Sequence, residues 1–209
     1  MISDTIDKIL QGAAHIFFTE GFSTGIDRVI SECGVAKMTL YQHFKTKEGL
    51  ICAILKDVQT SLQKEIRREA EINAKNPNAQ LEAACLILCE GMNDPELRVG
   101  LSIRALLEFP GAETPVHEAA RHLDLTILKW FERLCEDAQV PDAPNAARQI
   151  LHIAKGCFLM APTVGIEASE LIALDLLSSV LAQSEEFPPP HTGVRRSNGH
   201  SRSLPAART

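Results

Sequence analysis

The sequence predicts an all-α protein, and two observations carry that prediction. Apolar residues recur at steps of three and four along almost the whole chain, which is the spacing of one buried helix face. No stretch alternates between apolar and polar residues for long enough to predict a β-strand. We therefore expect about nine helices, with prolines and glycines between them.

The composition excludes several classes of protein. No apolar run of the 209 residues approaches the roughly 20 residues that a membrane helix needs. The N-terminus lacks the basic and apolar regions of a secretory signal, and six scattered cysteines are too few for a disulfide scaffold. We expect a cytoplasmic protein with free thiols and no cofactor. Its formal charge of −6 argues against nonspecific binding to polyanions.

The N-terminal third is expected to hold four helices. The first starts after Ser3 as N-cap and stops at Gly21, and two short helices lie over 26–33 and 35–44. Gly34 separates the short pair, because glycine adopts the left-handed backbone that ends a helix sharply. A long helix over 47–70 follows.

Capping residues before prolines mark the later helices. Asn76, Asp94 and Thr114 each precede a proline, which suits the first helical turn, and Asp142 marks a weaker start. The expected helices cover 78–92, 95–108, 115–138, 144–162 and 167–183. After them, residues 188–209 are rich in proline, serine and arginine, and we expect a disordered basic tail there.

Residues 26–47 carry the most informative pattern. Two short helices joined by a tight turn are typical of a helix-turn-helix, whose second helix enters the major groove of DNA. On that helix Leu40 and Phe44 are expected to face inward. The side chains left facing outward are Lys37, Met38, Thr39, Tyr41, Gln42 and His43. Such side chains can reach phosphates and base edges, and residues 36–47 hold three lysines and no acid.

Residues 6–56 resemble the DNA-binding domain of the tetracycline-repressor (TetR) family of bacterial transcription regulators. The resemblance rests on Gly21-Phe22, on Gly34-Val35, on 37–44 (KMTLYQHF) and on 47–50 (KEGL). It implies a homodimer on a palindromic double-stranded DNA operator. The residues that it places at the DNA are Thr24, Arg28, Ala36, Lys37, Met38, Thr39, Tyr41, Gln42, His43, Lys45 and Lys47. It also implies three parts: a DNA-binding domain over 1–46, an effector-binding and dimerisation domain over 47–187, and the tail.

Three departures from the family pattern stand out. The loop from Gly21 to Ile26 is one residue shorter than usual, and Ala36 replaces the usual capping Ser or Thr. Gly49 stands where a capping Glu is frequent, so Thr46 lacks a capping-box partner. These departures bear on individual contacts more than on the fold.

The C-terminal helices suggest two further sites. Apolar side chains on several helices could line an effector pocket, although core packing is the simpler interpretation of each. The apolar candidates are Met92, Phe109, Trp130 and Phe158, and His117 is a further candidate. The last two helices, about 144–183, are apolar on more than one face, which favours a second chain as partner, with burial inside one chain as the alternative.

Enzymatic patterns are absent or incomplete. Residues 117–121 nearly spell the zinc-protease motif HExxH but end in Arg121, and Cys85 with Cys89 has no second pair of metal ligands. We therefore expect no catalytic residue and no metal site. The sequence favours a ligand-responsive repressor. The alternatives are an activator, a ligand-independent regulator, or a helical enzyme or scaffold that retains the hairpin.

Overall fold

The structure, a computed structural model, describes residues 2–72 and 76–182. Within these residues the chain forms nine α-helices and no strand, which confirms the predicted class. The helices are α1 (Ile2–Glu20), α2 (Ile26–Cys33), α3 (Lys37–Phe44), α4 (Lys47–Ile72), α5 (Pro77–Asn93), α6 (Leu101–Glu108), α7 (Pro115–Asp137), α8 (Ala143–Val164) and α9 (Ile166–Ala182). The expected tail over 188–209 lies outside the described residues.

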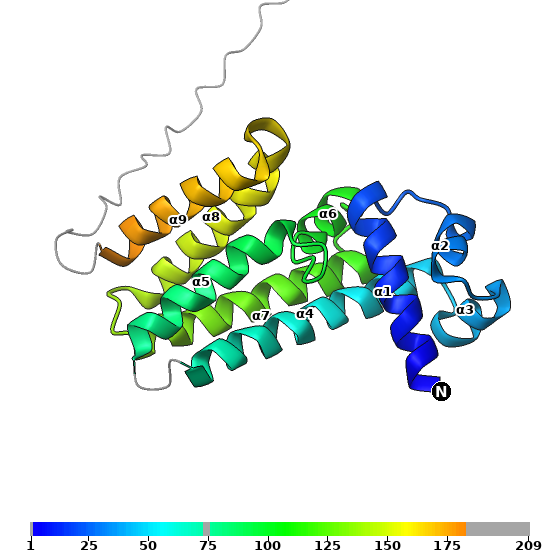
Figure 1. The fold of residues 1–209 in the computed structure, drawn as a ribbon, viewed down its shortest axis with the longest axis horizontal. Helices are drawn as coiled ribbons and strands as arrows, with labels where there is room; N and C mark the ends of the chain where they lie inside the picture. Colours follow the sequence, from blue (N-terminus) through cyan, green and yellow to red (C-terminus); the bar gives the residue numbers. More distant parts are fainter. Residues whose placement is uncertain (1, 73–75, 183–209) are drawn as a thin grey trace, which may run out of the picture.

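The helices form a small N-terminal unit and a long bundle (Figure 1). α1, α2 and α3 gather at one end of the molecule, and α4 runs from them along the bundle that α5, α7, α8 and α9 complete. With 26 residues, α4 is about 39 Å long. The short α6 packs on α7 at the junction beside α1. A change in the bundle can therefore reach the N-terminal helices through α4 or through α6.

Glycines end the first two helices as predicted. Gly21 has a φ of 93° and Gly34 a φ of 59°, and the N–H of Gly34 donates to the carbonyl of Ile30 at 2.9 Å. This left-handed turn lets the side chains of Val29, Cys33 and Leu40 meet in the core, where all three are buried.

Asn76 and Thr114 form the predicted capping hydrogen bonds, Asp142 takes the predicted N-cap position without such a bond, and the prediction for Ser3 is wrong. The side chain of Asn76 accepts from the N–H of Ala79 at 3.2 Å, and Thr114 accepts from the N–H of His117 at 3.3 Å. Asp142 makes no such bond because its backbone is left-handed, with a φ of 48°. Since α1 begins at Ile2, Ser3 lies inside the helix and not before it.

The helix predicted over 95–108 is also wrong, since α6 begins only at Leu101. Asp94 does accept from the N–H groups of Glu96 and Leu97, at 2.6 and 2.7 Å, but it caps a single turn. Arg98 then adopts a φ of 52°. The next two N–H groups, at 99 and 100, donate to the carbonyls of residues 91 and 92 and so complete the end of α5.

The described helices share one apolar core, and five of the six cysteines are buried in or beside it. Burial raises the pKa of the Cys89 thiol to about 12 and that of the Cys135 thiol to about 11. Burial also raises the pKa of the Cys85 thiol, so Cys85 and Cys89 are buried, protonated thiols at neutral pH. None of the described helices combines the length and the apolar character needed to span a bilayer.

Candidate nucleic-acid interface

The outer face of α3 is polar apart from one large apolar side chain. Leu40 is fully buried and Phe44 is half-buried against the core, which confirms the predicted inward face. Met38 is 71% exposed and so contributes little to the core. An apolar group held in solvent at the start of such a helix is available to contact a thymine methyl group in the major groove.

The structure leaves most of the predicted DNA-contact residues accessible. Eight of the eleven are exposed: Arg28, Ala36, Lys37, Met38, Tyr41, Gln42, His43 and Lys45. Thr24, Thr39 and Lys47 are half-buried. Ala36 forms the N-cap of α3 without a side-chain hydrogen bond, as its methyl group dictates. The exposed set lies on α3, on its flanks and on α2, the elements that a helix-turn-helix presents to DNA.

Two of the expected cations are already paired in the free chain. The amine of Lys37 lies 2.8 Å from the carboxylate of Asp27, and this hydrogen bond raises the pKa of Lys37. Arg28 lies 2.9 Å from Glu20 and 3.0 Å from Glu32. Phosphates must therefore compete with carboxylates for both cations, which sequence spacing alone did not reveal.

Lys47 differs from the other lysines near α3. Its amine stands 5.8 Å from the centre of the Phe17 ring, a distance at which a cation is attracted to an aromatic face. Burial lowers the pKa of Lys47, and the nearby charge of Glu108 opposes that shift. Lys47 thus links the start of α4 to α1, in addition to the expected role at a phosphate.

The connection between α3 and α4 is tightly packed around Gly49. Thr46 caps α4, since its hydroxyl accepts from the N–H of Gly49 at 2.9 Å. A Cβ at Gly49 would lie 2.5 Å from the carbonyl oxygen of Phe44, which is shorter than any real contact. The missing capping Glu is thus explained, because no side chain fits at this position.

The predicted effector residues do not line one common cavity. Met92 is fully buried, and Nδ1 of His117 lies 2.9 Å from the carbonyl oxygen of Phe109. The Phe109 ring lies 5.9 Å from that of Phe22, and Trp130 is half-buried against the core. Phe158 lines a cavity of about 460 Å³ beside α6. The effector pocket therefore stays a prediction, with Phe158 as its best-placed member.

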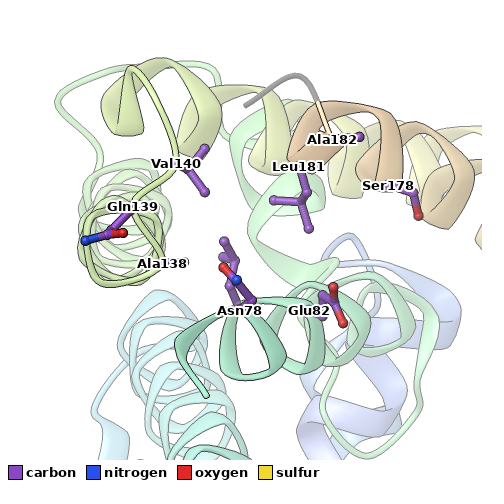
Figure 2. A pocket seen from close by; sticks show the side chains of 9 residues that line it. Asn78, Glu82, Ala138, Gln139, Val140, Ser178, Leu181 and Ala182 are labelled. Atoms are coloured by element: carbon purple, nitrogen blue, oxygen red, sulfur yellow. The ribbon is translucent and has the colours of Figure 1, made fainter. Parts of the chain in front are cut away.

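Other hollows lie along the bundle. One of about 420 Å³ is formed by α5, α9 and the α7–α8 connection, and Figure 2 shows Asn78, Glu82, Val140 and Leu181 around it. It lies at the end of the bundle remote from α1, α2 and α3 (Figure 1). Another, of about 490 Å³, lies between α4 and α7. Within the described residues, no group of three or more ligating side chains could hold a metal ion.

An apolar groove runs along α8 and α9. It has a volume of about 390 Å³, and its walls include Met160, Val164, Ile172 and Leu176, which are 42–55% exposed. The second apolar face predicted for these helices is thus present and faces solvent.

Comparisons with known proteins agree with this geometry. Residues 9–54 match the family described as bacterial regulatory proteins of the tetR family. A 78-residue segment is 31% identical to YerO, an uncharacterized HTH-type transcriptional regulator of Bacillus subtilis. That match covers 36% of this chain and 27% of the relative.

Solved structures extend the likeness over nearly the whole chain. A TetR-family transcriptional regulator from Streptomyces coelicolor is 25% identical, with a TM-score of 0.78, over 88% of this chain and 97% of that one. A TetR-family regulator from Agrobacterium tumefaciens shares the fold at 20% identity, with a TM-score of 0.74, over 87% of this chain and 100% of that one. The likeness thus includes the C-terminal bundle as well as the N-terminal helices.

Proposed function

Because this chain belongs to the TetR family of transcriptional regulators and carries its DNA-binding domain, we propose that it is a ligand-responsive repressor. It binds a pseudo-palindromic operator as a homodimer, and a small molecule releases it. The observation that carries the proposal is the exposed face of α3, with Met38, Tyr41 and His43 in solvent above the buried Leu40. Members of the family are DNA-binding transcription factors and not enzymes.

Operator binding is supported by the chemistry of that face. Residues 36–44 would enter the major groove, with Lys37, Met38 and Thr39 nearest the base edges. Tyr41 and His43 would hold phosphates, and the capped start of α4 offers N–H groups to a further phosphate. The DNA-binding domain would cover 1–46, and the effector and dimer domain 47–187.

Dimerisation is supported by the apolar groove on α8 and α9. Met160, Val164, Ile172 and Leu176 expose apolar surface that a second copy would cover. Pairing the same face of two copies gives a two-fold axis, and a two-fold protein requires a pseudo-palindromic operator.

Ligand response is supported by α4, which belongs to both parts of the molecule. A ligand bound in the bundle can change DNA affinity only if it prefers one arrangement of the two DNA-binding domains over the other. Since α4 packs on α1, α5 and α7, a shift in the bundle alters the position of α1.

Selection of bound sequences from random genomic DNA tests the proposal. We expect the selected sequences to contain a pseudo-palindrome. The logarithm of the binding constant should fall linearly with the logarithm of the salt concentration, at a slope of about −5 to −7, as for roughly six to eight neutralised phosphates. Ile172→Glu is expected to give a monomer by light scattering and to weaken operator binding. A monomeric wild-type protein would contradict the proposal. Footprints that do not overlap promoters would instead favour the activator.

A further inference from the structure

We propose that the cavity between α6 and the α8–α9 turn binds the effector, and that this effector is an amphipathic monocarboxylate. Such a molecule has one carboxylate on a compact apolar body. The inference rests on the proposed function, since it names the chemistry of the ligand to which the regulator responds.

The lining of this cavity is apolar around a single cation. Its walls come from Phe158, Leu159, Pro162 and Ile166, and its volume of about 460 Å³ lies in the range of small-molecule sites. Arg104 is the only ionisable side chain among its lining residues, and Asn93 adds an amide. An apolar body with one anionic group matches that distribution.

The guanidinium of Arg104 has N–H donors that could bind such an anion. Its carboxylate neighbour is Glu108, at 3.9 Å, which is longer than a hydrogen bond. A guanidinium carries five N–H donors and binds carboxylates through two parallel hydrogen bonds. Arg104 is also about 70% shielded from solvent, so a ligand carboxylate there would meet less competition from water.

Acidic side chains lie near the cavity without lining it. The pKa of Glu170 is raised by burial and by the charges of Glu90, Glu167 and Asp94, so these carboxylates are close to one another. None of them is among the lining residues. They favour a cationic ligand, which is the rival that the experiment must exclude.

Two walls of the cavity touch the end of α1, which explains how occupancy would reach the DNA-binding domain. The ring of Phe158 lies 6.4 Å from that of Phe18, and it packs so closely on Gly100 that a Cβ there would lie 2.3 Å from it. On the other side, Nη1 of Arg104 lies 2.9 Å from the place of a Cβ on Gly21. A ligand that moves Phe158 or Arg104 therefore presses on residues 18–21.

The cavity is separate from the proposed dimer groove. On α8 it is lined by Phe158 and Pro162, whereas Met160 and Val164 line the groove. Residues two apart on a helix point about 200° apart, so the two hollows use opposite sides of α8. No residue lines both the groove and the cavity.

Calorimetric titration of the full chain with three probes that share an eight-carbon chain tests the proposal. The probes are octanoate, 1-octanol and octyltrimethylammonium. We expect octanoate to bind about tenfold or more tightly than octanol, because a hydrogen bond to a charged group adds that much affinity. Arg104→Gln should bring this ratio close to one, and Arg133→Gln, an exposed arginine of α7, should leave it unchanged. Ile166→Trp fills the mouth and should weaken both probes.

Equal binding of octanoate and octanol to the wild type, or tighter binding of the cationic probe, would overturn the proposal. So would absent binding, or a ratio that survives Arg104→Gln. Thermal unfolding of each variant checks that it is folded. Binding of the selected DNA without ligand, measured on the same samples, separates failure of this inference from failure of the proposed function. On that DNA, octanoate should lower the affinity of the wild type and not that of Arg104→Gln.

Discussion

The guanidinium of Arg98 donates a 2.9 Å hydrogen bond to the side-chain oxygen of Gln11. This bond joins the α5–α6 connection to α1. Arg98 is 5% exposed and has a φ of 52°, and its Nε has no hydrogen-bond partner among the described residues. Burial lowers the pKa of Arg98, with Glu96 and Asp57 opposing that shift. The DNA-binding domain is thus held to the bundle by a buried charge with few partners.

Gln11→Ala should destabilise the protein by about 1–3 kcal/mol, because within the described residues it leaves the buried guanidinium of Arg98 with only the 3.3 Å hydrogen bond to the Glu96 carbonyl. Urea unfolding measures the loss, and amide exchange should increase most in α1. Gln63→Ala, which removes a glutamine side chain from α4 and not from α1, serves as the control. Equal losses in both variants would show that the Arg98 contact contributes nothing specific.

Asp57 should make stability depend on pH. Burial and the charge of Asp7 raise its pKa, while Arg98 lowers it, and the net shift is upward. The folded state therefore binds this proton more tightly than the unfolded chain, whose Asp pKa is about 3.9. The stabilisation that protonated Asp57 contributes is fully present below the pKa of the unfolded chain. It is lost as the pH rises through the pKa of Asp57 in the folded protein.

Asp57→Asn tests this linkage, because it keeps a neutral group and can still accept from Gln11. We expect the variant to be more stable than the wild type at pH 7, by a margin that shrinks toward pH 4. Urea unfolding between pH 4 and pH 8 measures it. Glu113→Gln, at an exposed carboxyl between α6 and α7, should leave the wild-type profile unchanged. A margin that grows toward low pH would contradict the account.

Met38 is expected to recognise thymine methyl groups. Replacing thymine by uracil in each half-site should weaken binding of the wild type about 3- to 10-fold, as for the loss of one buried methyl or two. Met38→Ala should lose the sensitivity to uracil. Fluorescence anisotropy with the selected operator measures both effects. A wild type that binds both operators equally would remove Met38 from base recognition.

Asp27 is expected to weaken DNA binding by holding Lys37. Asp27→Asn removes the 2.8 Å ion pair and a negative charge near the phosphates. We expect tighter binding to all sequences and a salt slope steeper by about 1 per protomer. Glu113→Gln, outside the DNA-binding domain, is the matched change in net charge. An unchanged slope in Asp27→Asn would indicate that the carboxylate of Asp27 does not lie near the phosphates.

Gly49→Ala should destabilise the protein by about 1–3 kcal/mol, although alanine is the better helix former. The reason is the 2.5 Å approach of the new Cβ to the Phe44 carbonyl, which forces α3 to shift against α4. Gly25→Ser is the contrasting change, since nothing lies within 4 Å of a Cβ there. A serine N-cap should stabilise α2 by a few tenths of a kcal/mol, because glycine is itself a tolerated N-cap. Thermal unfolding of both variants decides the matter.

The later helix starts show how far local signals extend. Asn76, Asp94 and Thr114 carry the same signal, a capping side chain before proline, and two of them begin long helices. After Asp94 the helix stops within one turn. There the backbone of Gly100 packs against Phe158, and Arg98 turns inward toward Gln11. Contacts with α1 and α8 overrode the local preference.

The sequence by itself determined the helices of the N-terminal domain and the exposed face of α3. Those features depend on the periodic spacing of apolar residues and on turns at glycine, both of which act over a few residues. Only the tertiary structure decided that Lys37 and Arg28 are paired, that Gly49 has no space for a side chain, and that Arg104 enters an apolar cavity. Each depends on groups that packing brings together from separate turns or helices. The spacing of apolar residues in the sequence carries no information about the distances between such groups.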